Sequence, residues 1–301
     1  MNRRATLAAL ALSLGLASGG IASPDTARTD VASLRAAAPG GCHAREGRAF
    51  VPAGSVELGE DGPGRPGRAV RVEGFWIDRH EVTNRQFAAF VAATGYVTRA
   101  EREGGSAVFV QPEHLAGDDA AQWWKFVSRA SWRRPHGGGP EDLAHADEPV
   151  VHVDFEDAQA YARWVGGVLP TEAQWERAAR GDQAGPRTPS AWAYDDHGRP
   201  IANTWQGEFP LSQSGEDHFT GLAPAGCFAA NAFGLQDMIG NVWEWTASAA
   251  ADRADERLIK GGSFLCAFNY CANFRPAAWQ AQEADLGASH VGFRVAYDRQ
   301  A

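Results

Sequence analysis

Two cysteines, Cys266 and Cys271, lie five positions apart near the C-terminus, although this chain of 301 residues has only four cysteines. Two thiols that lie close together can form a disulfide, act as a redox pair, or bind a soft metal such as Cu(I). The residues alone leave these three alternatives open. The other two cysteines, Cys42 and Cys227, are far apart in the sequence. Four cysteines allow three disulfide connectivities, so their pairing also stays open.

Two glycine-containing stretches carry side-chain oxygens of the kind that bind a hard cation such as Ca²⁺. The first runs over 203–210 and continues over 214–219, and the second runs over 234–245. Neither stretch matches an EF-hand loop, and the alternative is that its carboxylates and carboxamides cap turns. The nine histidines include no i,i+4 pair, and neither a P-loop nor a Gly-x-Ser-x-Gly turn is present.

The composition is that of a globular chain, with 44% hydrophobic and 22% charged residues. Eleven tryptophans and 34 glycines favour a loop-rich fold with tight turns. The net charge of −9 comes without any basic stripe, which argues against nucleic acid as a partner.

The N-terminus has the pattern of an export signal. Arg3 and Arg4 precede an apolar run over 5–17, and Ala22 is a candidate cleavage position. The apolar run is too short to span a membrane. We therefore predict a signal peptide over 1–22, a linker over 23–45 and one compact domain over 46–301. The protein is expected to be exported, either to the periplasm or out of the cell.

Three helices are predicted from capping residues and helical spacing. The first begins after Thr83, which forms a capping box with Gln86, and ends at Gly95. The second runs from Asp154 to Gly166, and the third begins after Thr171 and ends at Gly181.

Strands are predicted from alternating or short apolar runs. A hairpin or short strand pair is expected over 50–59, and single strands over 70–77, 258–260 and 291–296. Turn residues dominate between 181 and 239, which predicts an irregular region there.

The chain as a whole resembles the formylglycine-generating enzymes, the sulfatase-modifying factors. The matching pieces are spread in order over nearly the whole mature chain: 77–84, 147–153, 169–176, 202–210, 240–245, 261–271 and 292–294. The block Asn203–Pro210 and the pattern Ser263-x-x-Cys266-x-x-x-Tyr270-Cys271 are the most specific among them. The resemblance implies a single α+β domain with little regular secondary structure, in a C-type lectin-like fold.

For the cysteine pair, the resemblance implies a copper site. Cys266 and Cys271 match the two catalytic cysteines that bind one Cu(I) in the family. Ser263 matches a serine near the oxygen-binding pocket, and Tyr270 matches a tyrosine that lines the substrate cleft. The implied reaction converts a cysteine of an unfolded sulfatase segment, of the type Cys-x-Pro-x-Arg, into Cα-formylglycine. It consumes O₂ and a thiol reductant, and the enzyme is expected to be a monomer.

The resemblance also implies two structural calcium ions. Carried over position by position, the ligands of the first are Asn203, the Thr204 carbonyl, Asp217 and the Phe219 carbonyl. The ligands of the second are Asp237, the Gly240 carbonyl, the Val242 carbonyl and Glu244.

The sequence departs from its relatives at two positions near the expected substrate cleft. Trp279 stands where relatives have arginine, and His290 stands where they have asparagine. These departures leave an alternative function open, a non-catalytic binding module of the same fold with Cys266–Cys271 as a structural disulfide. A second alternative, an iron-dependent sulfoxide synthase, requires a histidine-rich site in an added helical domain, and the sequence has no such pattern.

Overall fold

A computed structural model of the chain describes residues 34, 42, 44–59, 67–115, 117, 120–183, 188–251 and 253–298. The predicted signal peptide over 1–22 and most of the predicted linker over 23–45 lie outside these residues. None of the helices in the described ranges is both long and apolar enough to cross a membrane.

Each predicted helix forms, and each begins with the local contacts that its sequence specifies. Helix α1 (Asn84–Thr94) has the capping box of Thr83 and Gln86 and ends at Gly95 in the left-handed conformation. Helix α3 (Phe155–Trp164) is capped by Asp154, and α4 (Glu172–Arg180) by Thr171 with Gln174. The helices that the sequence did not predict are short: α2 (Arg99–Glu103), α5 (Ser190–Ala193), and the 3₁₀ turns η3 (Ala120–Trp123) and η4 (Pro140–Asp142).

The N-terminal strands form a bent ribbon rather than the predicted local hairpin. Strand β1 (Arg48–Val51) pairs with β4 (Phe75–Asp78), and β2 (Gly54–Leu58) pairs with β3 (Arg68–Val72), in one continuous antiparallel register. The pairing predicted within 50–59 is therefore wrong, because its two strands lie end to end. The single strand predicted over 70–77 is interrupted at Gly74, where an added Cβ would lie 2.9 Å from the Phe50 ring.

A four-stranded sheet forms the centre of the domain, with the strand order β10-β7-β8-β9. Its strands are β7 (Trp243–Ala250), β8 (Arg253–Lys260), β9 (Trp279–Glu283) and β10 (Val291–Gly292). The strand predicted over 258–260 is confirmed as the end of β8. The strand predicted over 291–296 is wrong in its extent. It splits into β10 and β11 (Ala296–Tyr297), and β11 joins a different sheet, beside β4.

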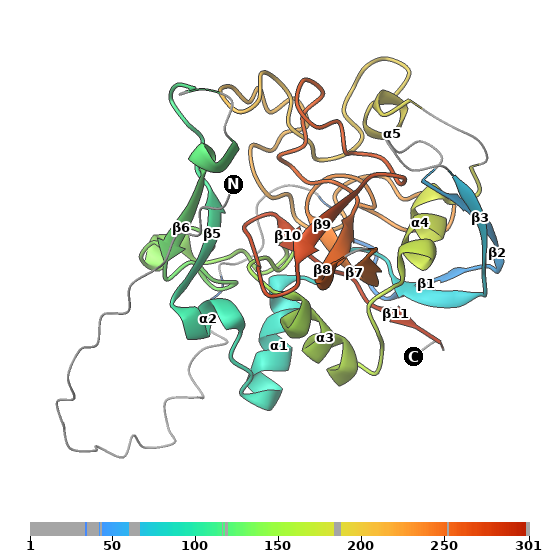
Figure 1. Cartoon of the computed structure of the whole chain (residues 1–301), viewed down its shortest axis with the longest axis horizontal. Coiled ribbons are helices and arrows are strands. Elements are labelled where there is room, and N and C mark those ends of the chain that lie inside the picture. Colours follow the sequence, from blue (N-terminus) through green and yellow to red (C-terminus); the bar gives the residue numbers. More distant parts are fainter. Residues whose placement is uncertain are drawn as a thin grey trace, which may run out of the picture.

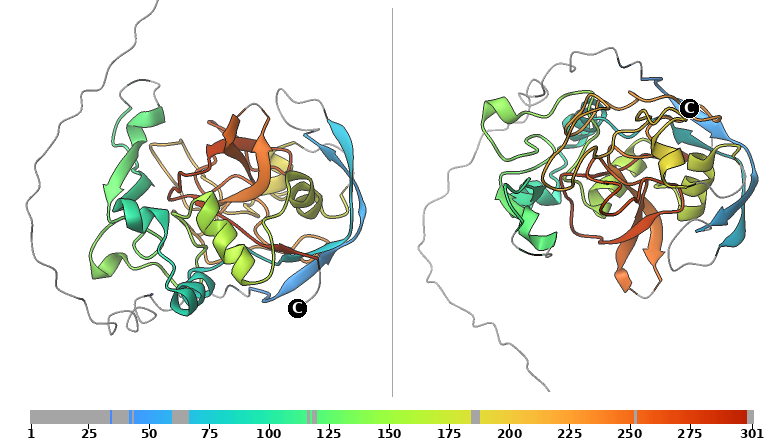
Figure 2. Two further views of the ribbon diagram at one scale, coloured as in Figure 1. Left: turned by 60° about the horizontal axis from the view of Figure 1, so that its bottom comes forward. Right: turned by 90° about the horizontal axis from the view of Figure 1, so that it is seen from above.

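The hairpin of β5 (Gly105–Phe109) and β6 (Trp124–Ser128) stands at one side of the domain, and the β2–β3 half of the ribbon stands at the other (Figures 1 and 2). Between them, the chain from Tyr194 to Val242 contains no helix or strand. The structure thus confirms the predicted loop-rich α+β domain.

Aromatic side chains join these elements into the main core. The ring of Phe87 on α1 lies 5.9 Å from Tyr161 on α3 and 5.2 Å from Trp132, between ring centroids. Tyr161 in turn contacts Phe293, which follows β10. Burial of these large apolar rings is the main stabilising term. It fixes α1 and α3 against the end of the central sheet.

Candidate active site

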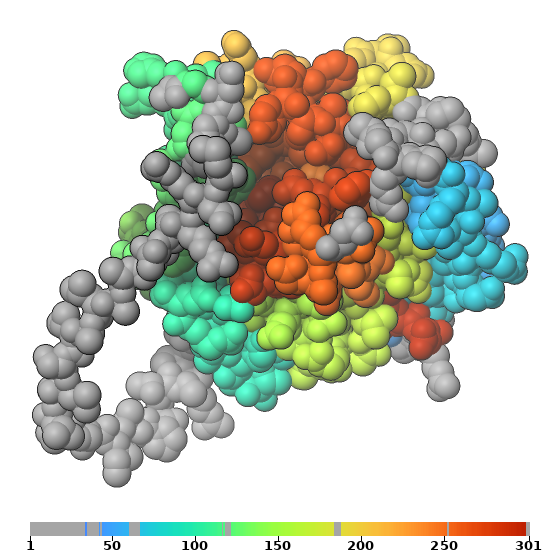
Figure 3. All heavy atoms as spheres, in the orientation of Figure 1, coloured from blue at the N-terminus to red at the C-terminus, as the bar shows by residue number. Residues whose placement is uncertain are grey.

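A cavity of about 410 Å³ lies between the β5–β6 hairpin and the C-terminal segment. Figure 3 shows the hollow between the green hairpin residues and the orange and red residues of that segment. All four predicted catalytic residues line it. None of its 16 described lining residues is Asp, Glu, Lys or Arg. Apart from the cysteine pair, its wall is aromatic and polar but uncharged. The lining residues are Ala107, Trp123, Trp124, Phe209, Trp243, Ser263, Leu265, Cys266, Tyr270, Cys271, Asn273, Gln280, Gln282, Leu286, Ala288 and His290.

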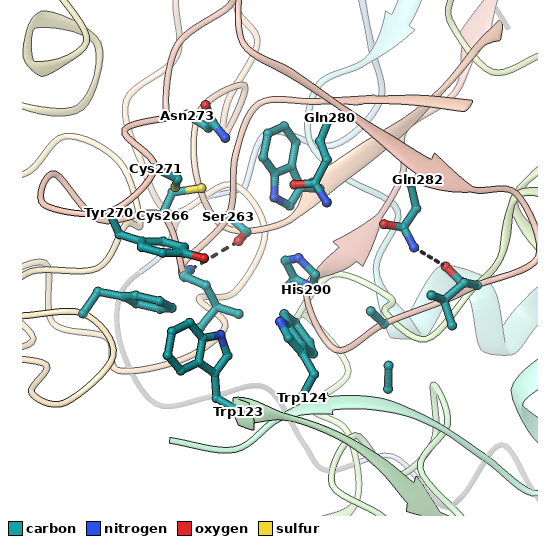
Figure 4. A pocket seen from close by; sticks show the side chains of 16 residues that line it. Trp123, Trp124, Ser263, Cys266, Tyr270, Cys271, Asn273, Gln280, Gln282 and His290 are labelled. Carbon is teal, nitrogen blue, oxygen red and sulfur yellow. Dashed lines mark hydrogen bonds between the residues drawn. The ribbon is translucent and has the colours of Figure 1, made fainter. Parts of the chain in front are cut away.

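Tight turns after β8 bring the two cysteines together. Gly261 and Gly262 have φ angles of +97° and +77°, a region that glycine adopts without strain. The Cys266 N–H then donates to the Ser263 carbonyl at 2.9 Å, and the Cys271 N–H donates to the Ala267 carbonyl at 3.3 Å. Figure 4 shows the two sulfur atoms side by side at the cavity wall. Both thiols are free, so the structure contains no Cys266–Cys271 disulfide.

The two thiols are electrostatically unequal. The hydrogen bond from the Cys266 thiol, together with backbone N–H groups, lowers the pKa of Cys271 to about 7. The same hydrogen bond and burial raise the pKa of Cys266 well above its ordinary value. Near neutral pH Cys271 is therefore partly ionised while Cys266 keeps its proton, which makes the pair a soft, partly anionic ligand.

Ser263 and Tyr270 both lie beside this pair at the cavity wall. Ser263 is fully buried, and its Oγ accepts a hydrogen bond from the Leu265 N–H at 3.3 Å. Tyr270 is half exposed, and its ring stacks on Phe209 with 4.7 Å between centroids. The serine thus lies deep in the site, and the tyrosine forms part of its rim.

Hydrogen bonds join three of the four residues predicted for the first calcium site, Thr204, Asp217 and Phe219. The Asp217 carboxylate accepts hydrogen bonds from the Thr204 N–H at 3.2 Å and the Phe219 N–H at 2.9 Å. The amide of Gln206 donates both to Asp217 and to the Thr204 carbonyl. Asn203 is buried, and its Oδ1 has no hydrogen-bond partner among the described residues. This orphaned oxygen and the Asp217 carboxylate fit a site for a hard cation.

The second predicted site is built around a buried guanidinium that the sequence analysis did not identify. Glu244 accepts hydrogen bonds from Arg294 at 2.6 and 2.8 Å and from the Trp175 indole at 2.7 Å. Arg294 also donates to the Asp237 carbonyl at 3.2 Å. The Asp237 carboxylate accepts the N–H groups of Gly226 and, at 3.4 Å, Phe228.

A third buried carboxyl group, that of Glu81, belongs to this cluster. The sequence did not predict Glu81 as a site residue. Burial and the nearby charge of Asp237 raise the pKa of Glu81 well above its ordinary value, and its Oε2 has no hydrogen-bond partner among the described residues. Arg294 faces Glu81, Asp237 and Glu244. Burial also raises the pKa of Asp237, so a cation bound beside these carboxyl groups would stabilise their charged forms. Both residues lie within matched pieces of the sequence, 77–84 and 292–294, but their burial in one cluster does not follow from those pieces, since Glu81 bonds Asn241 across 160 residues.

Both predicted cation sites would depend on carbonyl and amide oxygens as well as carboxylates. Within the described ranges, no group of three or more His, Cys, Asp or Glu side chains converges as a metal site. Gly240 and Val242, the two predicted carbonyl ligands of the second site, lie in the turn that leads from Asp237 into β7.

The structure settles the pairing of the remaining cysteines, because Cys42 and Cys227 form a disulfide.

The two residues that differ from those of the relatives, His290 and Trp279, lie in different places. His290 lines the cavity, whereas Trp279 is not among the described residues that do so. Trp279 begins β9, opposite Lys260 on β8, and its neighbour Gln280 reaches the cavity instead.

Comparisons with known proteins agree with this geometry. The sequence profile described as "Sulfatase-modifying factor enzyme 1-like domain" matches residues 37–299. A protein of Thermomonospora curvata named "Formylglycine-generating enzyme" is 44% identical over 285 residues, which cover 84% of this chain and 94% of that protein. A Bos taurus protein named "Inactive C-alpha-formylglycine-generating enzyme 2" is 40% identical, over 82% of this chain and 86% of that protein.

Among solved structures, PvdO from Pseudomonas aeruginosa has the same fold. It superposes with a TM-score of 0.60 at 23% identity, over 84% of this chain and 94% of that one. The profile match includes the positions of the cysteine pair, and the identity to the curated relatives extends over most of the chain. The chain therefore belongs to the sulfatase-modifying factor enzyme 1-like family.

Proposed function

We propose that this protein is an exported, copper-dependent oxidase that converts a cysteine of an unfolded sulfatase segment, of the type Cys-x-Pro-x-Arg, into Cα-formylglycine. The observation that carries the proposal is the free pair Cys266 and Cys271, held at the wall of an otherwise uncharged cavity of about 410 Å³. A disulfide or a dispersed pair of thiols at these positions would not support it.

The donor set fits a soft monovalent cation. Cys271 supplies a thiolate near neutral pH, and the thiol of Cys266 is close enough to donate a hydrogen bond to it. Two thiolates satisfy the preference of Cu(I) for soft ligands, and a hard cation would favour oxygen donors. Copper bound here would supply the redox chemistry with O₂.

The proposed reaction balances with two equivalents of thiol. The substrate side chain CH₂SH, one O₂ and two thiols give CHO, H₂S, one H₂O and one disulfide. The carbon atom is oxidised from thiol to aldehyde, its C–S bond is broken, and a C=O bond forms. O₂ is reduced with electrons from the substrate and from the reductant.

The residues of the chain have separate roles in this proposal. Cys266 and Cys271 hold the metal, and Ser263 presents a buried hydroxyl beside them. Tyr270, Phe209 and the neighbouring tryptophans form an apolar wall that holds an extended peptide and excludes water from the reacting carbon. The uncharged lining requires the charged residues of the substrate to remain outside the cavity, because a buried unpaired charge is costly.

We further propose that two calcium ions order the loop-rich half of the domain. The first would be held by Asn203, the Thr204 carbonyl, Asp217 and the Phe219 carbonyl. The second would be held by Asp237, the Gly240 and Val242 carbonyls, and Glu244. The orphaned Oδ1 of Asn203 and the buried carboxyl groups around Arg294 support these sites.

Export is supported by the Cys42–Cys227 disulfide, because disulfides persist in oxidising compartments. A sulfatase that emerges unfolded from the membrane would meet the enzyme there. Finding the protein in the cytoplasm with residues 1–22 still attached would refute this location.

The non-catalytic alternative keeps one supporting observation, the relatives named as inactive at about the same identity.

A mass-spectrometric assay decides between the two functions. The mature protein, loaded with Cu(I) and supplied with O₂ and a thiol, is incubated with the peptide Leu-Cys-Thr-Pro-Ser-Arg. Copper-dependent replacement of CH₂SH by CHO supports the oxidase. Tight Cu(I) binding without conversion would refute this substrate, and absence of both would favour the binding module.

A further inference from the structure

The imidazole of His290 is the one ionisable side chain of the described cavity wall, apart from the two cysteines and Tyr270. The side chain is only 8% exposed. Its Nδ1 is completely buried and has no hydrogen-bond partner among the described residues. Figure 4 shows the ring at the wall, above Trp124 and below Ser263 and Gln280, without a hydrogen bond to the other side chains drawn.

The position of this ring is fixed from several sides. Its centroid lies 4.7 Å from that of Trp124, which begins β6. The His290 carbonyl accepts a hydrogen bond from the Trp243 N–H at 2.9 Å, and the Ser289 N–H donates to the Ala107 carbonyl at 3.0 Å. The ring is therefore held rigidly at the cavity wall, where the nitrogen that is not completely buried can meet a ligand.

The ring is neutral, which limits what it can bind. Burial and the nearby His152 lower the pKa of His290 to about 3. A neutral imidazole has one donor and one acceptor nitrogen. Buried backbone N–H groups without an acceptor are rare, and by extension of this rule to the ring we assign the hydrogen to Nε2 and the acceptor role to the buried Nδ1. Nε2 is then the donor that the side chain presents to the cavity.

The chemistry of the cavity identifies the acceptor. A carboxylate or phosphate would lose its hydration there without meeting a cation, because no Lys or Arg is among the described lining residues. A peptide carbonyl oxygen is neutral and loses less on burial. Resting on the function proposed above, we infer that His290 is a substrate-positioning residue whose Nε2–H binds a backbone carbonyl of the polypeptide next to the reacting cysteine.

Two variants test this role by peptide binding rather than turnover. His290→Leu removes the donor, whereas His290→Gln keeps an amide N–H at the same bond separation from Cβ as Nε2. The probe is the unreactive peptide Leu-Ser-Thr-Pro-Ser-Arg, whose Kd is followed by the fluorescence of the cavity tryptophans. Loss of one neutral hydrogen bond should raise Kd roughly three- to tenfold in the leucine variant. The glutamine variant should stay close to the wild type.

The thermal stability of the His290→Leu variant distinguishes a substrate-positioning role of His290 from a structural one. His290→Leu removes a buried nitrogen without a partner, so its thermal midpoint should be unchanged or higher, and its Cu(I) affinity should be unchanged. An unchanged Kd in the leucine variant would overturn the inference, as would a lower midpoint together with weaker Cu(I) binding. An effect on kcat alone, with Kd and KM unchanged, would also overturn it. Binding of the unreactive peptide needs neither copper nor O₂. A negative result in the oxidation assay can therefore be distinguished from a failure of the inference about His290.

Discussion

The guanidinium of Arg294 holds the carboxylate of Glu244 with two hydrogen bonds, from Nη2 to Oε1 at 2.6 Å and from Nε to Oε2 at 2.8 Å. Both side chains are buried, and Glu81 and Asp237 face the same guanidinium. Substitution of Arg294→Met leaves these carboxylates in the interior without their cation. The free energy of unfolding, measured with urea in the presence of a calcium chelator, should fall by about 3–5 kcal/mol.

Arg71 provides the matched control for this substitution. Its ion pair with Glu73 is largely exposed to solvent, at 71% and 82% for the two side chains. Arg71→Met should therefore change the unfolding free energy little, because exposed pairs are screened by water. If the two variants are equally stable, the buried pair does not hold the cluster together.

The helices could be predicted because their signals are local, whereas the pairing of the strands could not. The capping boxes of Thr83 with Gln86 and of Thr171 with Gln174 involve residues three apart. The break at Gly74, in contrast, depends on the approach of Phe50, and the split after β10 depends on Arg294 turning inward to Glu244. Such contacts join residues that are distant in sequence, so an alternating apolar pattern does not predict them.

The candidate site shows the same difference between local features, which could be predicted, and contacts between distant residues, which could not. The spacing of Cys266 and Cys271 within one loop made their proximity predictable. Glu81 and Arg294 were missed because burial, which no single residue type reveals, gives them their role. Gln206 was missed for a related reason, since only the structure shows its amide between the Asp217 carboxylate and the Thr204 carbonyl.

Substitution of either proposed copper ligand, Cys266 or Cys271, should abolish turnover. A serine hydroxyl is a hard, neutral ligand, so Cys266→Ser and Cys271→Ser should both lose tight Cu(I) binding in a chelator competition. Calcium content and the far-ultraviolet circular dichroism should remain nearly those of the wild type, because the loop is held by backbone hydrogen bonds. A variant with wild-type activity would show that its thiol is not a copper ligand.

The reactivity of Cys271 in the copper-free protein should depend on pH through its lowered pKa of about 7. The thiolate is the nucleophile, so alkylation by iodoacetamide should accelerate about tenfold per pH unit below 7 and level off above it. Cys266→Ala removes the S–H donor that contributes most to the lowering. The pKa of Cys271 should then rise toward its ordinary value of about 8.5, and alkylation at pH 7 should slow several-fold. An unchanged pH profile in this variant would show that the two thiols do not interact.

The disulfide of Cys42 and Cys227 should affect the second calcium site. Cys227 lies between Gly226 and Phe228, whose N–H groups bind the carboxylate of Asp237. The side-chain amide of Gln236 binds the carbonyls of the same two residues, at 2.7 and 3.0 Å. The disulfide therefore fixes the backbone that orients a proposed calcium ligand.

The double substitution Cys42→Ser with Cys227→Ser should weaken binding at this site, because Asp237 must then be ordered when the cation binds. Titration of the calcium-free protein should show one of two binding events weakened roughly three- to tenfold, as expected for about 1 kcal/mol of lost pre-organisation. The unfolding free energy should also fall, by about 2–5 kcal/mol for a loop of this length. The pair Cys266→Ser with Cys271→Ser is the matched control and should bind calcium as the wild type does. Equal weakening in both pairs, or in neither, would show that the disulfide does not act through Asp237.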